Sequence, residues 1–145
     1  MTTTHDHDFY AWTQTQAQLL RLGQLDALDT YHLAEEIADI GRTEKRALES
    51  RLEVLIMHLL KWQFQPNLRS RSWQLTIREQ RLRVQALLED NPSLKPHLNQ
   101  RLDQIYRLAA INAERETGLD QFPEHCPYEI AQILTDNFLP AAPSD

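Results

Sequence analysis

The sequence contains little glycine and almost no cysteine. Cys126 is the only cysteine in 145 residues, which excludes an internal disulfide and a zinc site built from several cysteines. Only three glycines are present, and the runs of Val, Ile and Thr that form strands are missing. Leu, Ala, Glu, Gln and Arg dominate instead, as they do in helices. The sequence therefore predicts an all-α protein.

The sequence also lacks a long hydrophobic run. The longest uncharged apolar stretch, residues 54–60, is far short of the roughly 20 residues that a membrane-spanning helix needs. The N-terminus has no basic residue followed by a hydrophobic stretch, as a secretory signal would have. We therefore expect a cytoplasmic protein that does not associate with membranes.

The length of the chain is typical of one compact domain. Apolar residues make up 41% and charged residues 25% of the sequence, which is the balance of an ordinary globular chain. We expect a single helical domain over residues 8–140, with disordered ends at residues 1–7 and 141–145.

Apolar residues recur at helical spacing along most of the chain. Polar capping residues mark most expected helix starts, and glycine or proline marks most expected ends. Gly41 is expected either to break or to bend its helix. The short connections favour an irregular antiparallel bundle of four to five helices. The expected helices begin near Asp8, Asp29, Thr43, Ser70 or Ser72, Ser93 and Pro127, and end near Gly23, Gly41, Pro66, Leu88, Gly118 and Leu134.

The net charge of -6 is distributed unevenly. Residues 61–83 contain six basic residues and one acidic residue, so this segment carries +5 while the rest of the chain carries -11. An acidic chain with one basic segment is better suited to recognising an acidic partner than to general attraction by nucleic acid.

Aromatic side chains accompany the cations of this basic segment. Guanidinium and ammonium groups pair with anions, and aromatic faces stack on bases or cations. We therefore predict an anion-binding or partner-binding surface there. Alternatively, the aromatic residues fill the core and the arginines form ion pairs within the chain. The candidate residues are Lys61, Trp62, Arg69, Arg71, Trp73 and Arg78.

These charges lead us to predict a non-enzymatic binding or interaction module. The partner would be an unknown acidic protein or a second copy of the chain, with nucleic acid less favoured.

A different hypothesis is a small metal-dependent or hydrolytic enzyme. His32 and Glu36 share one helical face, and Glu53 and His58 could face them to form an interhelical pocket. Di-iron bundles need paired Glu-x-x-His motifs, which this sequence lacks, so we assign no metal ligands and no cofactor. The competing interpretation makes His58 a core histidine that hydrogen-bonds a neighbour.

Two other groups of candidate residues have simpler explanations. Cys126 follows His125 directly, but we interpret it as a structural thiol because neighbouring loop residues rarely form a catalytic Cys–His dyad. His5 and His7 form an isolated pair in the segment that we expect to be disordered.

Several short strings occur together along the chain. They are Asp8–Trp12 (DFYAW), His32–Ile37 (HLAEEI), Arg51–Leu55 (RLEVL), His58–Gln63 (HLLKWQ), Arg69–Trp73 (RSRSW), Glu116–Leu119 (ETGL) and Phe122–Tyr128 (FPEHCPY). With these strings the chain resembles an uncharacterised bacterial family, domain of unknown function twenty-nine, over about residues 8–140. The resemblance implies a compact helical fold and a bacterial source. It implies no activity and no catalytic residue.

Overall fold

The computed structural model describes residues 4–144. Over these residues it contains five α-helices, two short 3₁₀ helices and no strand, which confirms the all-α prediction. None of the helices in this part of the chain combines the length and the apolar character needed to cross a membrane. The elements are α1 (Phe9–Arg21), η1 (Leu25–Ala27), α2 (Thr30–Phe64), η2 (Pro66–Leu68), α3 (Arg71–Asp90), α4 (Leu94–Thr117) and α5 (Ile130–Ile133).

Residues 8–140, for which we predict a single domain, belong to two compact units. The N-terminal unit extends to Thr43 and contains α1 and the beginning of α2. The C-terminal unit extends from Glu44 and contains the rest of α2 together with α3, α4 and α5.

Helix α2 continues through Gly41, where the sequence suggests a break or a bend. A glycine inside a helix costs only about 0.5–1 kcal/mol relative to alanine. No proline lies near Gly41, and the apolar pattern resumes directly after it. The local cost is therefore too small to end the helix, and of the two predicted alternatives the break does not occur.

Most helix ends follow the predicted local signals. Asp8 caps α1 by accepting a hydrogen bond from the backbone N–H of Ala11 at 3.0 Å, and Ser70 caps α3 through the N–H of Trp73 at 3.2 Å. Gly118 ends α4 with a φ of +75°, a left-handed conformation that favours glycine.

One predicted helix start lacks its capping hydrogen bond, and another lies at a different residue. Ser93 occupies the N-cap position of α4, but its side chain accepts no hydrogen bond there. Helix α5 begins at Ile130 rather than at Pro127, because Glu129 and Gln132 form a capping box at that later point.

Residues 4–7 form a turn, whereas we expect disorder for the whole segment 1–7. The backbone N–H groups of His7 and Asp8 both donate to the carbonyl of Thr4 at 3.2 Å. Residues 1–3 lie outside the described residues. At the other end, residues 141–144 have no regular secondary structure, and Asp145 lies outside the described residues.

In the N-terminal unit, α1 is joined to the start of α2 by hydrogen bonds from its buried face. The indole Nε1 of Trp12 donates to Asp29 Oδ2 at 2.9 Å. The backbone N–H of Asp29 donates to Oε1 of Gln16 at 2.8 Å. Both Trp12 and Gln16 are buried.

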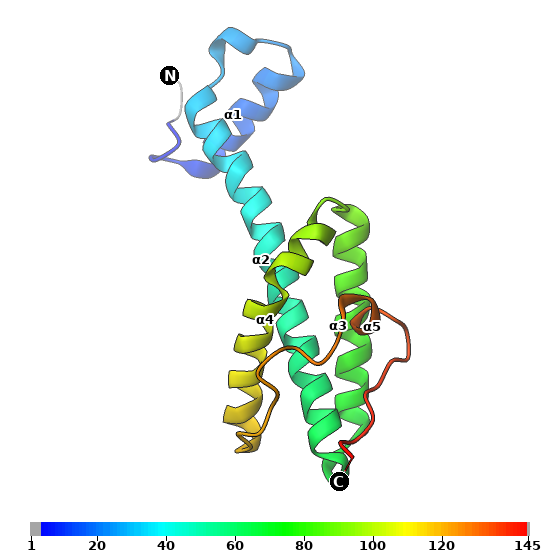
Figure 1. Ribbon diagram of the computed structural model, residues 1–145. Coiled ribbons are helices and arrows are strands. Elements are labelled where there is room, and N and C mark those ends of the chain that lie inside the picture. Colours follow the sequence, from blue (N-terminus) through cyan, green and yellow to red (C-terminus); the bar gives the residue numbers. More distant parts are fainter. Residues whose placement is uncertain (1–3, 145) are drawn as a thin grey trace. The chain divides into compact units, whose positions relative to one another are not determined.

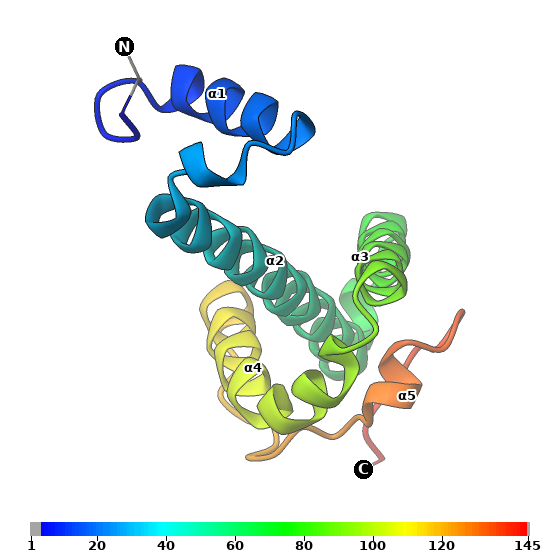
Figure 2. The same ribbon diagram turned by 90° about the horizontal axis from the view of Figure 1, so that it is seen from above.

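In the C-terminal unit, α3 and α4 lie beside the second half of α2 (Figures 1 and 2). Helix α3 runs antiparallel to α2, and α4 runs antiparallel to α3, as the bundle prediction requires. Short α5 follows α4 and leads into a C-terminal segment that returns to α3. The buried core consists of Leu48, Leu52, Leu55, Ile56, Leu59, Leu60, Ile77, Val84, Leu98, Ile105, Tyr106, Ala109, Ala113, Tyr128, Ile130 and Ile133.

Candidate functional site

Lys61 and Trp73, both predicted members of the basic surface, are engaged within the C-terminal unit. The Lys61 ammonium forms an ion pair with Glu116 Oε2 at 2.7 Å, and its side chain is only 12% exposed. It also lies 4.8 Å from the centre of the Trp73 ring, within the range of a cation–π contact. The same ion pair lowers the pKa of Glu116. Lys61 therefore joins α2 to α4 and is not free to bind a partner.

Trp62 and Arg69 form a second such pair. The Arg69 Nε donates to the backbone carbonyl of Trp62 at 2.8 Å, and its guanidinium lies 4.9 Å from the centre of the Trp62 ring. Arg69 thereby holds the connection between α2 and α3. The alternative interpretation, in which cations and aromatics serve the fold, fits these four residues.

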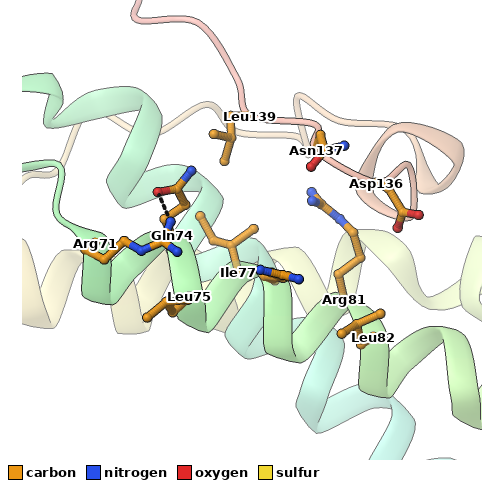
Figure 3. Close-up of a pocket in the computed structure, with 10 residues that line it drawn as sticks. Arg71, Gln74, Leu75, Ile77, Arg81, Leu82, Asp136, Asn137 and Leu139 are labelled. Atoms are coloured by element: carbon orange, nitrogen blue, oxygen red, sulfur yellow. Dashed lines mark hydrogen bonds between the residues drawn. The ribbon is translucent and has the colours of Figure 1, made fainter.

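Arg71 and Arg78, the other two predicted residues, are exposed and line a groove along α3 (Figure 3). We call it the α3 groove. It lies between α3 and the C-terminal segment and has a volume of about 560 Å³. Arg71 donates to the side chain of Gln74 at 3.0 Å. The lining residues are Arg71, Gln74, Leu75, Ile77, Arg78, Arg81, Leu82, Asp136, Asn137 and Leu139.

Arg81 also lines the α3 groove, although it is only 4% exposed. Its Nε donates to the carbonyl of Ile133 at 2.8 Å, and its Nη2 donates to that of Phe138 at 2.7 Å. Burial lowers the pKa of Arg81, and Asp136 opposes this shift, but a guanidinium remains charged in proteins. Arg81 forms no ion pair with any described residue of the chain. The groove thus contains a buried positive charge without a paired carboxylate.

Arg81 lies within the apolar stripe of α3, although it is charged. Ile77, Arg81 and Val84 are spaced by four and three residues and are all buried. That spacing is the available signal. It is easily missed, because an arginine at such a position usually turns toward solvent.

Apolar side chains border the cations of the groove. Leu75 is 44% and Leu82 is 55% exposed. With Arg71 and Arg78 they occupy successive turns along one face of α3. This face can receive a ligand that carries both a negative charge and apolar side chains.

A second group of polar side chains gathers in the N-terminal unit, around His5. The Nε2 of His5 contacts Glu36 Oε1 at 2.6 Å, and its Nδ1 contacts Asp6 Oδ1 at 2.8 Å. The ring of His5 stacks on that of His32, with the ring centres 4.3 Å apart and the planes at 6°. The hydrogen bond to Glu36, reinforced by that to Asp6, raises the pKa of His5. His5 is therefore part of an ordered cluster, and our interpretation of it as half of an isolated pair is wrong.

His32 is held by Asp29 at the start of α2. The Nδ1 of His32 contacts Asp29 Oδ2 at 2.7 Å, and the backbone N–H of His32 donates to Asp29 Oδ1 at 3.3 Å. The hydrogen bond from His32 lowers the pKa of Asp29, against a smaller opposing effect of burial. Trp12 donates to the same oxygen, Asp29 Oδ2, so two side chains from different segments hold this carboxylate.

The structure does not bring His32, Glu36, Glu53 and His58 into one interhelical pocket. His32 and Glu36 belong to the N-terminal unit, whereas Glu53 and His58 belong to the C-terminal unit. All four lie on the single helix α2. The pocket hypothesis depends on two helices that meet around Gly41, and a continuous helix excludes that arrangement.

Glu53 and His58 each have a local partner instead. Asn112 donates to Glu53 at 2.6 Å, while burial raises the pKa of this carboxyl group. His58 Nδ1 lies 2.9 Å from the carbonyl of Val54, one turn earlier in α2, and burial lowers its pKa. These contacts are those of a partly buried structural histidine and glutamate.

Cys126 has the environment of a structural thiol. Its Sγ donates to the carbonyl of Tyr128 at 3.3 Å, and burial raises its pKa to about 11. The neighbouring His125 is exposed and makes no hydrogen bond to Cys126. A thiol with this pKa is almost entirely protonated near neutral pH and is a poor nucleophile.

Comparison with known proteins agrees with this helical fold. The family described as "Domain of unknown function DUF29" matches residues 4–139. The chain is similar in fold to the crystal structure of an α-helical protein of unknown function from Rhodospirillum rubrum, with a TM-score of 0.60. The two are 24% identical, over 95% of this chain and 93% of the other. No curated protein matches the chain.

Proposed function

The chain belongs to the DUF29 family, and we propose that it is a protein-binding module whose α3 groove receives an acidic, apolar segment of a cytoplasmic protein partner. The observation that carries this proposal is the buried guanidinium of Arg81, which lies in the groove without an ion pair in the described part of the chain.

A buried cation is costly unless a negative charge or several hydrogen bonds compensate it. Two backbone carbonyls satisfy part of the Arg81 guanidinium, but neither carries a full negative charge. Asp136, in the same groove, acts on this charge without forming an ion pair with it, and a carboxylate that enters the groove would pair with it directly. Arg71 and Arg78, exposed at the same groove, would attract that carboxylate and orient it.

The rest of the groove favours a protein over nucleic acid. Leu75 and Leu82 offer apolar contacts that a phosphate backbone does not use. Trp62 and Trp73 each have one ring face covered by a cation of the chain, which leaves less aromatic surface for stacking on bases. Asp136 at the rim repels a polyanion but tolerates a single well-placed carboxylate.

Photo-crosslinking in the source bacterium tests the proposal directly. A photoreactive phenylalanine analogue replaces Leu75 in the groove, and in a control chain it replaces Leu108, a comparably exposed leucine of α4. We expect a discrete protein adduct from position 75 and none from position 108. The crosslinked segment should be acidic and should contain apolar residues.

Affinity measurements with the purified partner then test the charges. The double variant Arg71→Glu with Arg78→Glu should weaken binding at least about tenfold. The control variant Lys45→Glu with Arg46→Glu makes the same change in net charge at exposed positions of α2 and should weaken binding less than about threefold. Equal losses in both variants, adducts with nucleic acid, or no adduct above the control would each refute the proposal.

A further inference from the structure

The cluster around His5 in the N-terminal unit combines metal-binding side chains from two segments. His5 and Asp6 come from the turn before α1, and His32 comes from the first turns of α2. One ligand atom from each of these three residues lies within 4.8 Å of the other two. They border a hollow of about 530 Å³, so an ion has room to enter.

The types of ligand favour one class of metal. Two imidazoles and one carboxylate are a typical ligand set for Zn²⁺ and neighbouring first-row transition metals, and they leave a coordination position open. Mg²⁺ and Ca²⁺ prefer ligand sets made entirely of oxygen.

The contacts of His32 orient it as a metal ligand. Its Nδ1 faces Asp29 Oδ2 at 2.7 Å, and because an ionised carboxylate has no proton to give, this nitrogen must carry the hydrogen. The lone pair of neutral His32 therefore lies on Nε2. Trp12 also donates to Asp29 Oδ2 and helps to hold it in place. Histidines that bind metal ions commonly donate their other ring N–H to a carboxylate in this way.

His5 is the ligand that must move. Nitrogen lone pairs lie in the ring plane, and the parallel rings of His5 and His32 cannot direct both lone pairs at one ion. Ligand atoms around a tetrahedral zinc ion are about 3.4 Å apart. A turn of the His5 ring must therefore also bring its ligand nitrogen closer to the ligand atoms of Asp6 and His32, which now lie within 4.8 Å. The ion then replaces the proton held between His5 and Glu36, and that proton passes to solvent. Glu36 then lies beside the ion, where its carboxylate can complete the coordination.

We propose that His5, Asp6 and His32 bind a divalent transition-metal ion of the zinc class, and that this ion fastens residues 4–7 to the start of α2. The proposal does not depend on the α3 groove, which lies in the other unit.

Zinc titration of the full, untagged chain after chelator treatment tests this site. Calorimetry should show one Zn²⁺ bound per chain, with no comparable heat from Mg²⁺. His32→Ala and His5→Ala should each weaken Zn²⁺ binding at least about tenfold. Asp29→Asn, which alters no ligand, should weaken it by about 10-fold to 100-fold. Circular dichroism of each variant verifies that its helices are retained.

His7→Ala is the matched control, because His7 lies in the same turn but is exposed and outside the cluster. It should change the affinity less than about threefold. Zn²⁺ should also slow amide exchange in residues 5–8, a readout that does not require any variant. The proposal fails if Zn²⁺ binds no more tightly than Mg²⁺, if binding survives His32→Ala, or if His7→Ala weakens it as much as His5→Ala does.

Discussion

Arg81 and Arg83 lie two positions apart on α3 and have opposite environments. Arg81 is buried and donates to two carbonyls of the C-terminal region, whereas Arg83 is exposed and pairs with Glu79 at 3.1 Å. An exposed pair of this kind contributes little to stability. The buried guanidinium fastens residues 133–138 to α3 and at the same time brings a positive charge into the groove. Its position on the helix therefore decides both its structural and its proposed functional role.

The burial of His58 predicts how the stability of the protein depends on pH. Burial lowers its pKa below the ordinary value of 6.5; Lys61 adds to that shift, while the Val54 carbonyl and Glu116 oppose it. Between the lowered value and 6.5 the unfolded chain binds a proton that the folded chain does not, so stability falls as the pH decreases through this range. Between about pH 7 and 5.5, the free energy of unfolding measured with urea should therefore fall less in His58→Gln than in the natural chain.

The matched control for His58 is His125→Gln, since His125 is exposed. This variant should keep the pH dependence of the natural chain. The assignment to His58 is wrong if His58→Gln and the natural chain lose stability equally over the same pH range.

At the scale of secondary structure, two glycines have opposite effects on their helices. Gly41 lies inside α2, and a Cβ built there meets no atom within 4 Å. Gly118 ends α4 with a φ of +75°, and it too has open space around the Cβ position. A side chain therefore has room at both sites, and the two glycines differ only in backbone conformation.

Replacing each glycine by alanine should change stability in opposite directions. Gly41→Ala should raise the free energy of unfolding by about 0.5–1 kcal/mol, because alanine loses less backbone entropy in a helix. Gly118→Ala should lower it by about 1 kcal/mol or more, because a side chain is strained in the left-handed conformation. Urea unfolding followed by circular dichroism measures both changes, and equal signs would contradict this account.

At the scale of the whole molecule, the two units differ in how much they bury. In the N-terminal unit only Trp12 and Gln16 are buried among the described residues, and Ile37 and Ile40 are each 66% exposed. The C-terminal unit contains the entire cluster of buried core residues. Buried apolar surface is the main source of folding free energy, so the N-terminal unit gains less stability from packing than the C-terminal unit does.

Hydrogen exchange followed by mass spectrometry should reveal this difference. In the metal-free chain, backbone amides of α1 should exchange faster than those in the middle of α3 and α4, because local opening of the N-terminal unit exposes little apolar surface. The experiment compares peptides of similar length from each helix. Protection of α1 equal to that of α4 would mean that the N-terminal unit has a stabilising source other than its own core.

The sequence by itself determined the helical class and most helix ends. Ser70, Pro66 and Gly118 act on neighbouring backbone groups, so their effects can be recognised without knowing the fold. It also named Arg71 and Arg78 as candidate cations of a binding surface, and the structure places both at exposed positions.

Only the tertiary structure decided which polar side chains are engaged within the fold and which are free to bind. Glu116 neutralises Lys61 across 55 positions of sequence, and carbonyls more than 50 positions away hold Arg81 in the groove. His5 likewise meets Glu36 over 31 positions. These partners meet because the tertiary arrangement brings distant segments together, and local patterns of sequence contain no information about which distant polar groups come into contact.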